Sequence, residues 1–380
     1  MTPEGELIVR VAWDGSRITG VDLHSSRPHA AARVLVDRTP GEAVAIVPRL
    51  FSICGRSQAV AAALACEAAS GWASEAETLA ARERLVRGEI VQEYLWRMLL
   101  DWPPLTGRVA APQALAGARR EVHASLVPDE AAARFGATVA ARDAEFPEAI
   151  RAAVQQHVLG DGERWNALDD PASGECWLER RAAAPAALVT GLRESRAALG
   201  ASAVALLPAD SERVVRSMDA ALAADEAYER APTWHDAPAE TGALARTIGR
   251  PLVAHVAGRA GHTVVARLLA RVVELTELAR PNGRARAALC GAVASAPGRG
   301  LGWVETARGL LVHAVELTAT HVKRYRIVAP TEWNFHPRGA LPAGLAGTTV
   351  AEASEVARLA QLVVQSLDPC VTARVVVARV

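Results

Sequence analysis

The chain has 380 residues with 42 basic and 42 acidic side chains, so its formal net charge is zero. Without a positive excess or a basic run, it lacks the electrostatic footprint of a nucleic-acid-binding protein. No stretch approaches the roughly 20 consecutive apolar residues of a membrane span, and residues 1–6 lack the basic and apolar segments of a secretory signal. We therefore expect a cytoplasmic protein that binds neither nucleic acid nor membrane.

The N-terminal segment predicts a β-hairpin. Apolar residues alternate with polar ones over 7–11 and again over 18–23, and Asp14-Gly15 supplies a tight turn between them. From about Gly41 the pattern becomes helical, and Cys54 falls at or just before a helix N-terminus. Such a location would lower the pKa of the thiol and favour the thiolate, which is the form that binds metals.

The centre of the chain predicts helices. A long helix is expected over 73–100 and should stop at Trp102-Pro103-Pro104, since prolines cannot continue a helix. Residues 110–290 are rich in alanine and arginine and mostly helical in pattern. The clearest helix covers 264–278, and we expect the charged face of this helix to be solvated.

The last part of the chain predicts a second small sheet and a final helix. Residues 302–329 contain β-branched and alternating segments, whereas Gly298–Gly302 is expected to form a turn. An amphipathic pattern then leads into the cysteine motif that contains Cys370. The expected fold class is α+β, with one domain over 1–380. In that domain about 1–50 and 302–330 are β-rich, about 54–290 is mainly helical, and 350–367 is the C-terminal helix.

Two of the five cysteines lie in motifs at opposite ends of the chain. The motifs are Ser52-Ile53-Cys54-Gly55-Arg56-Ser57 and Asp368-Pro369-Cys370-Val371-Thr372-Ala373. They resemble the RxCGxC and DPCxxCxxH motifs that hold the metal centre of nickel–iron hydrogenase large subunits, with the second cysteine of each pair missing. Cys66, Cys176 and Cys290 are widely scattered, and we expect them to be ordinary inert thiols.

Four further segments carry the same resemblance, in the same order along the chain. Thr2–Leu7 resembles RxEGHL, and Leu99–Asp101 resembles the aspartate that follows the SHxxHFY helix in the enzymes, although the histidines of that helix are absent here. Glu305–His313 resembles EAPRGxLxH, and Tyr325–Arg338 resembles PTTWNxxPR. The resemblance implies a hydrogenase large-subunit-like fold. It would have an N-terminal β-hairpin and small sheets around a central helical bundle.

The departures from the family pattern imply that the enzyme's reaction is lost. In the enzymes four thiolates hold nickel, and the second cysteine of each pair also bridges to an iron that carries cyanide and carbon monoxide. Ser57 and Ala373 stand in those bridging positions, and Val376 replaces the terminal histidine. Because alanine offers no ligand, we expect no bimetallic centre, no catalytic residue and no bound nickel.

What remains could hold an intermediate of the metal centre. By resemblance, Cys54 and Cys370 would bind an Fe(CN)2(CO) fragment transiently. Arg308 and Arg338 would lie near this pocket with Asp368 beside Cys370, and arginine suits hydrogen bonding to cyanide nitrogens. His336 is a candidate for a further ligand, because the retained cysteines match the ligands that bind nickel alone in the enzymes. The ordinary alternatives are relic or redox-active thiols and a structural role for the arginines.

The resemblance therefore suggests a maturation factor of the HupK and HoxV type. In the first hypothesis the chain is a non-catalytic scaffold that receives an iron fragment from a small accessory chaperone and passes it to the hydrogenase large subunit. In the second it mimics the large subunit and acts only through protein contacts, without metal. A residual redox enzyme or hydrogen sensor is the third, disfavoured by the loss of both bridging cysteines.

Overall fold

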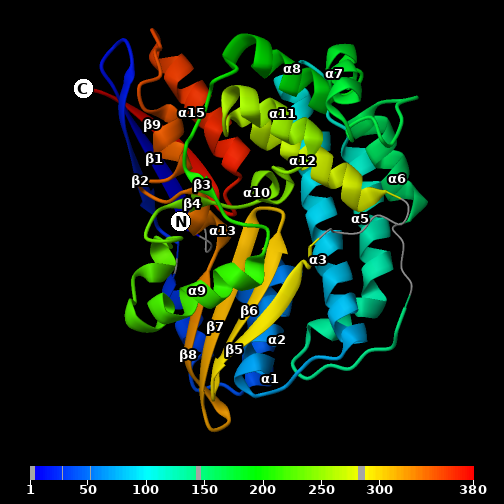
Figure 1. The fold of residues 1–380 in the computed structure, drawn as a ribbon, viewed down its shortest axis with the longest axis vertical. Helices are drawn as coiled ribbons and strands as arrows, with labels where there is room; N and C mark the ends of the chain where they lie inside the picture. The colour runs from blue at the N-terminus through cyan, green and yellow to red at the C-terminus, as the bar shows by residue number, and fades with distance from the viewer. Residues whose placement is uncertain (1–4, 28, 52, 143–146, 281–286) are drawn as a thin grey trace.

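A computed structural model describes residues 5–27, 29–51, 53–142, 147–280 and 287–380, and the described strands form three sheets among the helices (Figure 1). The strands are β1 Glu6–Trp13, β2 Ile18–Ser25, β3 Ala205–Leu206, β4 Ala239–Glu240, β5 Cys290–Ala296, β6 Arg299–Thr306, β7 Gly309–Thr318, β8 His321–Val328 and β9 Thr372–Arg379. The helices are α1 Pro40–Leu50, α2 Gly55–Ala69, α3 Ala76–Trp96, α4 Trp102–Leu105, α5 Pro112–Leu126, α6 Glu148–Val154, α7 Pro171–Arg180, α8 Ala184–Arg196, α9 Ser211–Ala224, α10 Ala243–Thr247, α11 Pro251–Ala260, α12 Val264–Ala279, α13 Pro330–Asn334, α14 Ala340–Leu345 and α15 Ala353–Leu367.

The first sheet joins the two ends of the chain. Its strand order is β2-β1-β9, and the predicted hairpin of β1 and β2 is confirmed. The hairpin turn is closed by Asp14, whose carboxylate accepts the backbone N–H of Arg17 at 2.9 Å. β9 lies parallel to β1 along its whole length, and the two strands run side by side in Figure 1. This pairing anchors the segment after Cys370 against the N-terminal strand.

The second sheet is antiparallel in the order β5-β6-β7-β8, and α2 packs closely against it. It confirms the predicted second sheet, but its strands begin at Cys290. The run Gly298–Gly302 is not only a turn, because Gly300 and Gly302 lie within β6. A Cβ atom at Gly302 would overlap the backbone of α2 at Ala61. Glycines in the strand therefore let the alanine-rich helix approach the sheet backbone.

Helix α12 is buried on its charged side as well as on its apolar side, so the expected solvated face is wrong. Arg267 and Glu274 are 2% and 6% exposed. Arg267 donates Nε and Nη2 to the carboxylate of Glu240, both at 2.8 Å, and Glu274 binds Arg246. These partners come from other elements of the fold, and they allow charged side chains to be buried because each is paired.

Two predicted boundaries also differ from the structure. The long helix does not stop before the prolines: a π-helical segment, Arg97–Asp101, follows α3, and α4 adds a turn that contains Pro103 and Pro104. Prolines are tolerated there because the first turn of a helix leaves its N–H groups unbonded. In the N-terminal region the strands end at Ser25, and residues 40–50 are helical.

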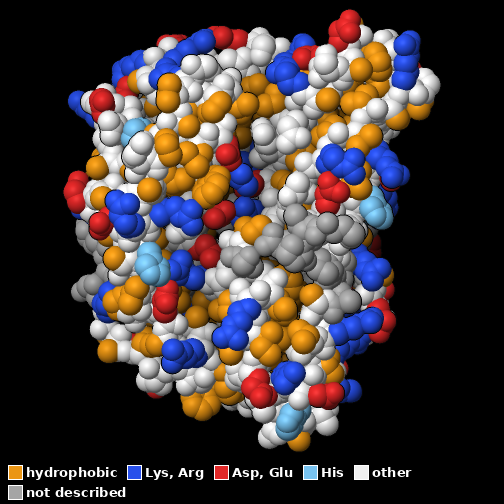
Figure 2. All heavy atoms as spheres, turned by 180° about the vertical axis from the view of Figure 1, so that it is seen from behind, with side chains coloured by type: hydrophobic (Ala, Val, Ile, Leu, Met, Phe, Trp, Pro, Cys, Tyr) orange, Lys and Arg blue, Asp and Glu red, His pale blue; other side chains and the backbone are white. Residues whose placement is uncertain are grey.

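The surface carries charges of both signs. On the face shown in Figure 2, basic and acidic side chains are interspersed over the described residues rather than gathered by sign. Ion pairs on the surface of the protein include Arg180 with Glu163 at 2.7 Å. This face therefore presents no field of a single sign.

None of the helices in the described ranges is long and apolar enough to cross a lipid bilayer.

Candidate functional site

Cys54 and Cys370 come from opposite ends of the chain and line the same small cavity. Cys54 immediately precedes α2, as its sequence pattern predicts, and Cys370 lies between α15 and β9. The cavity has a volume of about 60 Å³ and is also lined by Arg27, Gln58 and Glu332. Cys370 additionally borders an open cleft of about 910 Å³. The fold therefore brings the two thiols together at the edge of an open cleft.

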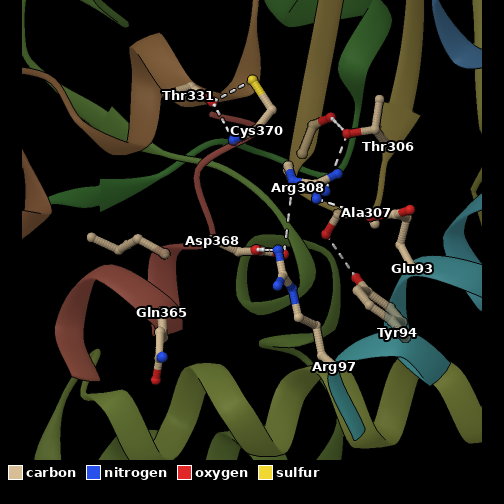
Figure 3. A network of polar contacts seen from close by, with 12 residues as sticks. Glu93, Tyr94, Arg97, Thr306, Ala307, Arg308, Thr331, Gln365, Asp368 and Cys370 are labelled. Carbon is tan, nitrogen blue, oxygen red and sulfur yellow. Dashed lines mark hydrogen bonds and ion pairs between the residues drawn. The ribbon is translucent and has the colours of Figure 1, made fainter. Parts of the chain in front are cut away.

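A hydrogen-bond donor contacts each sulfur. Gln58 Nε2 donates to Cys54 Sγ at 3.5 Å, and the Thr331 hydroxyl donates to Cys370 Sγ at 3.1 Å (Figure 3). Burial raises the pKa of the Cys54 thiol to about 12, and the nearby carboxylate of Glu89 raises this pKa as well. The expected lowering of this pKa by the helix N-terminus is therefore wrong, because burial disfavours the charged thiolate.

Arg308 lies at the buried centre of the site, in the turn between β6 and β7 (Figure 3). Its Nη2 donates to Glu93 Oε2 at 2.9 Å, whereas its Nε lies 3.9 Å from Asp368 Oδ2, too far for a hydrogen bond. That buried Nε has no hydrogen-bond partner among the described residues. The Arg308 charge interacts electrostatically with both Cys54 and Cys370. Its unpaired N–H can therefore donate to an acceptor bound beside the sulfurs.

Three charged residues spaced four apart along α3 and its π-helical continuation hold the separate segments of the site. Glu89 accepts hydrogen bonds from the first turn of α2, next to the first cysteine motif. Glu93 holds Arg308, and Arg97 Nη2 donates to Asp368 Oδ1 at 2.7 Å, beside the second motif. One continuous helical face thus positions both cysteine motifs and the arginine between them.

A second arginine lies beside the cysteine pair. Arg27 follows β2 and donates to Glu332 at 2.9 Å. Its charge interacts with Cys370 and with Cys54, and it lines the small cavity that both cysteines share. Arg27 therefore shares the small cavity with both thiols, and Arg308 shares the open cleft with Cys370.

Some of the predicted site residues are not brought to the cysteines. Arg338 was expected near the pocket, but its side chain is exposed and lines neither cavity. The short turn after α13 is closed locally, with the Arg338 backbone N–H donating to His336 Nδ1 at 3.0 Å. His336 is buried and lines neither cavity. Asp368 is buried and pairs with Arg97, and the start of the Thr2–Leu7 segment, up to residue 4, lies outside the described residues.

The positions of the missing cysteines are filled in two different ways. Ala373 is in β9, paired with Leu7 of β1, so it is part of the terminal sheet. Ser57 is in α2, and its hydroxyl donates to Glu89 Oε2 at 2.5 Å. Of the other cysteines, Cys66 and Cys290 are buried and Cys176 is exposed.

Several residues of the site were not predicted from the sequence. Glu89, Glu93 and Arg97 had a usable signal, because charges at i, i+4 and i+8 share one helical face. Thr331 lies in the segment that resembles PTTWNxxPR, but its contact with the Cys370 sulfur depends on how parts distant in the sequence pack together. Arg27 carries no local signal, since its position follows from the end of β2.

The donor set fits a small metal fragment that brings ligands of its own. In the described part of the chain no group of three or more His, Cys, Asp or Glu side chains is arranged to hold a metal ion. Two sulfurs and an unpaired arginine N–H are present instead. Thiolates bind soft metals, and the guanidinium donates to anionic acceptors, so the two functions complement each other.

Comparisons with known proteins agree with this architecture. A family model described as nickel-dependent hydrogenase matches residues 200–375. The chain is 32% identical to the hydrogenase expression/formation protein HoxV of Cupriavidus necator, over 98% of this chain and 96% of that protein. It is 33% identical to the hydrogenase expression/formation protein HupK of Rhizobium leguminosarum bv. viciae, over 97% and 95%. Its fold is similar to that of the Ni-Fe-Se hydrogenase from D. vulgaris Hildenborough, with a TM-score of 0.57, 16% identity and 93% of both chains covered.

Proposed function

The chain belongs to the family of HoxV- and HupK-type hydrogenase expression/formation proteins, and we propose that it is a non-catalytic scaffold in nickel–iron hydrogenase maturation. It would hold an Fe(CN)2(CO) fragment as cargo and transfer it to the hydrogenase large subunit. A small accessory chaperone would supply the fragment. The cargo leaves with the product, so it is a substrate of the scaffold and not a resident cofactor.

One observation carries this proposal. Cys54 and Cys370, which are 370 − 54 = 316 positions apart, line one cavity beside a buried arginine N–H that has no partner in the described residues. The sulfurs supply two soft ligands, and Arg308 supplies a donor for a cyanide nitrogen. The open cleft beside Cys370 gives a route by which a partner could reach the cargo.

The absence of the two bridging thiols supports a carrier over an enzyme. Neither Ser57 nor Ala373 contains a sulfur: the Ser57 hydroxyl donates a hydrogen bond to the buried Glu89 carboxylate, and Ala373 is part of a sheet. A fragment held by two iron–sulfur bonds can be released when those two bonds are replaced by bonds to the receiving protein. In this role Arg308 and Arg27 would orient the fragment electrostatically, and Asp368 would fix the loop that presents Cys370.

Infrared spectroscopy tests the proposal. The protein is purified anaerobically from a strain that makes hydrogenase, together with Cys54→Ala and Cys370→Ala. We expect cyanide and carbonyl stretching bands in the wild type that disappear in both variants. The wild type should also contain about one iron per chain, because two thiolates form a single binding site. A wild-type spectrum without these bands, with no iron by elemental analysis, would refute the scaffold.

The similarity to a large subunit also supports a second candidate, in which the chain mimics that subunit and recruits accessory proteins without metal. The two candidates differ in one readout. If Cys54→Ala and Cys370→Ala both support normal hydrogenase maturation in cells, protein contacts alone are the function. If maturation fails while the variants remain folded, the cysteines are required for the function.

A further inference from the structure

The first turn of α2 is capped in an unusual way. Cys54 is the N-cap residue, yet its side chain makes no capping hydrogen bond. The N–H groups of a first turn need acceptors from elsewhere. Glu89 of α3 supplies them: Oε1 accepts the N–H of Arg56 and Oε2 accepts the N–H of Ser57, both at 3.0 Å. A carboxylate from another helix therefore performs the task that an N-cap side chain usually performs.

The same carboxylate also holds the Ser57 hydroxyl. Ser57 is 1% exposed, and its Oγ donates to Glu89 Oε2 at 2.5 Å. Ser57 lines neither the small cavity nor the open cleft, although Cys54 lines the first and Glu89 the second. The oxygen that stands in the place of a bridging cysteine is thus turned toward α3 and bonded there.

We propose that Glu89 is a positioning residue that restricts the metal-binding side chains of the site to Cys54 and Cys370. By capping α2 it leaves the Cys54 thiol free to face the cavity. By binding Ser57 it keeps position 57 out of the coordination sphere. This inference rests on the proposed function and deepens it, because it explains why the site takes one metal fragment and not a pair of metals.

Glu89 should also affect a cysteine that is restored at position 57. A thiolate introduced at position 57 would lie close to the buried carboxylate of Glu89. Two negative charges buried side by side repel each other, which disfavours the thiolate. Restoring the cysteine alone should therefore fail to restore a third metal ligand. Removing the negative charge of Glu89 at the same time should allow it.

Calorimetric titration of the metal-free protein with Ni²⁺ alone, under anaerobic conditions, tests this. Ser57→Cys should bind Ni²⁺ within about threefold of the wild type, and Ser57→Cys/Glu89→Gln at least about tenfold more tightly, since a third thiolate becomes available. The matched control is Glu89→Gln alone, which removes the same carboxylate beside Cys54 but adds no thiol, and the double variant should bind Ni²⁺ more tightly than this control. A tenfold gain in Ser57→Cys alone, or no gain in the double variant, overturns the proposal.

A second measurement needs only single variants, in case the double variant does not fold. Folded Ser57→Cys is treated with iodoacetamide and digested with trypsin, which cleaves after Arg56 and separates position 57 from Cys54. Position 57 should be alkylated at least about tenfold more slowly than the new thiol of Ala59→Cys, because Ala59 lines the cleft. Equal rates at the two positions overturn the proposal. Both measurements use metal-free protein, so a failure of the cargo hypothesis would be seen separately, in the infrared spectrum.

Discussion

Acidification is expected to destabilise this fold through His313, a fully buried residue of β7. Its Nε2 lies 2.9 Å from Gln58 Oε1, and its Nδ1 lies 2.7 Å from the hydroxyl of Tyr325. The amide oxygen can only accept, so Nε2 carries the proton and the tyrosine hydroxyl donates to Nδ1. The neutral ring thus satisfies both contacts. Burial lowers the pKa of His313 from 6.5 to about 3.

The sign and size of the effect follow from that shift. Below pH 6.5 the unfolded chain binds a proton at this residue and the folded protein does not, so the stabilisation is complete above pH 6.5 and is lost as the pH falls toward 3. Between pH 7 and pH 5 the free energy of unfolding should fall by about 2 kcal/mol through this residue alone. Further loss is expected down to the pKa in the folded protein.

Urea unfolding of metal-free protein at pH 7, 6 and 5 measures this loss. Other carboxylates titrate in the same range, so the informative quantity is the difference from His313→Gln, which keeps a polar side chain but cannot titrate. The variant is expected to be less stable at pH 7 and to lose about 2 kcal/mol less on going to pH 5. Parallel pH dependences in the two proteins would refute the assignment of a neutral buried histidine.

Three further predictions follow from the packing. Glu240→Ala should lower the free energy of unfolding in urea by about 3–5 kcal/mol, because it leaves the Arg267 charge buried without its partner; a loss below about 1 kcal/mol would contradict this. Gly302→Ala should lower it by about 1–3 kcal/mol, because the new Cβ meets the α2 backbone; an unchanged urea midpoint would show that α2 can move away. Arg308→Lys should reduce the iron that copurifies with the protein, whereas the exposed Arg338→Ala should not; equal iron contents would contradict the placement of the two arginines.

The parts of the fold that depend on local patterns could be predicted from the sequence. The hairpin has alternating residues and an Asp-Gly turn, and the position of Cys54 before α2 follows from helical periodicity after it. The motif order along the chain also indicated a large-subunit-like fold. These features need only the residues of one segment, or short motifs that the family keeps.

The features that could not be predicted depend on partners distant in the chain. Periodicity correctly indicated a helix at α12, but its charged residues are buried because Glu240 and Arg246 come from outside that helix to pair with them. The run Gly298–Gly302 has turn-like composition, and only the close approach of α2 explains its glycines as strand residues. The motif that contains Arg338 gave its place in the chain but not the direction of its side chain.

The way in which the two cysteines are brought together bears on how cargo could be exchanged. Closing a loop of 316 residues costs about 5 kcal/mol of chain entropy. In this fold the parallel pairing of β1 with β9 and the ion pair of Arg97 with Asp368 hold the two motifs through protein contacts. If the metal itself held the motifs together, its release would free both ends of the chain. Because the fold holds them, a fragment could bind and leave while the site stays assembled, and a carrier that acts repeatedly requires that property.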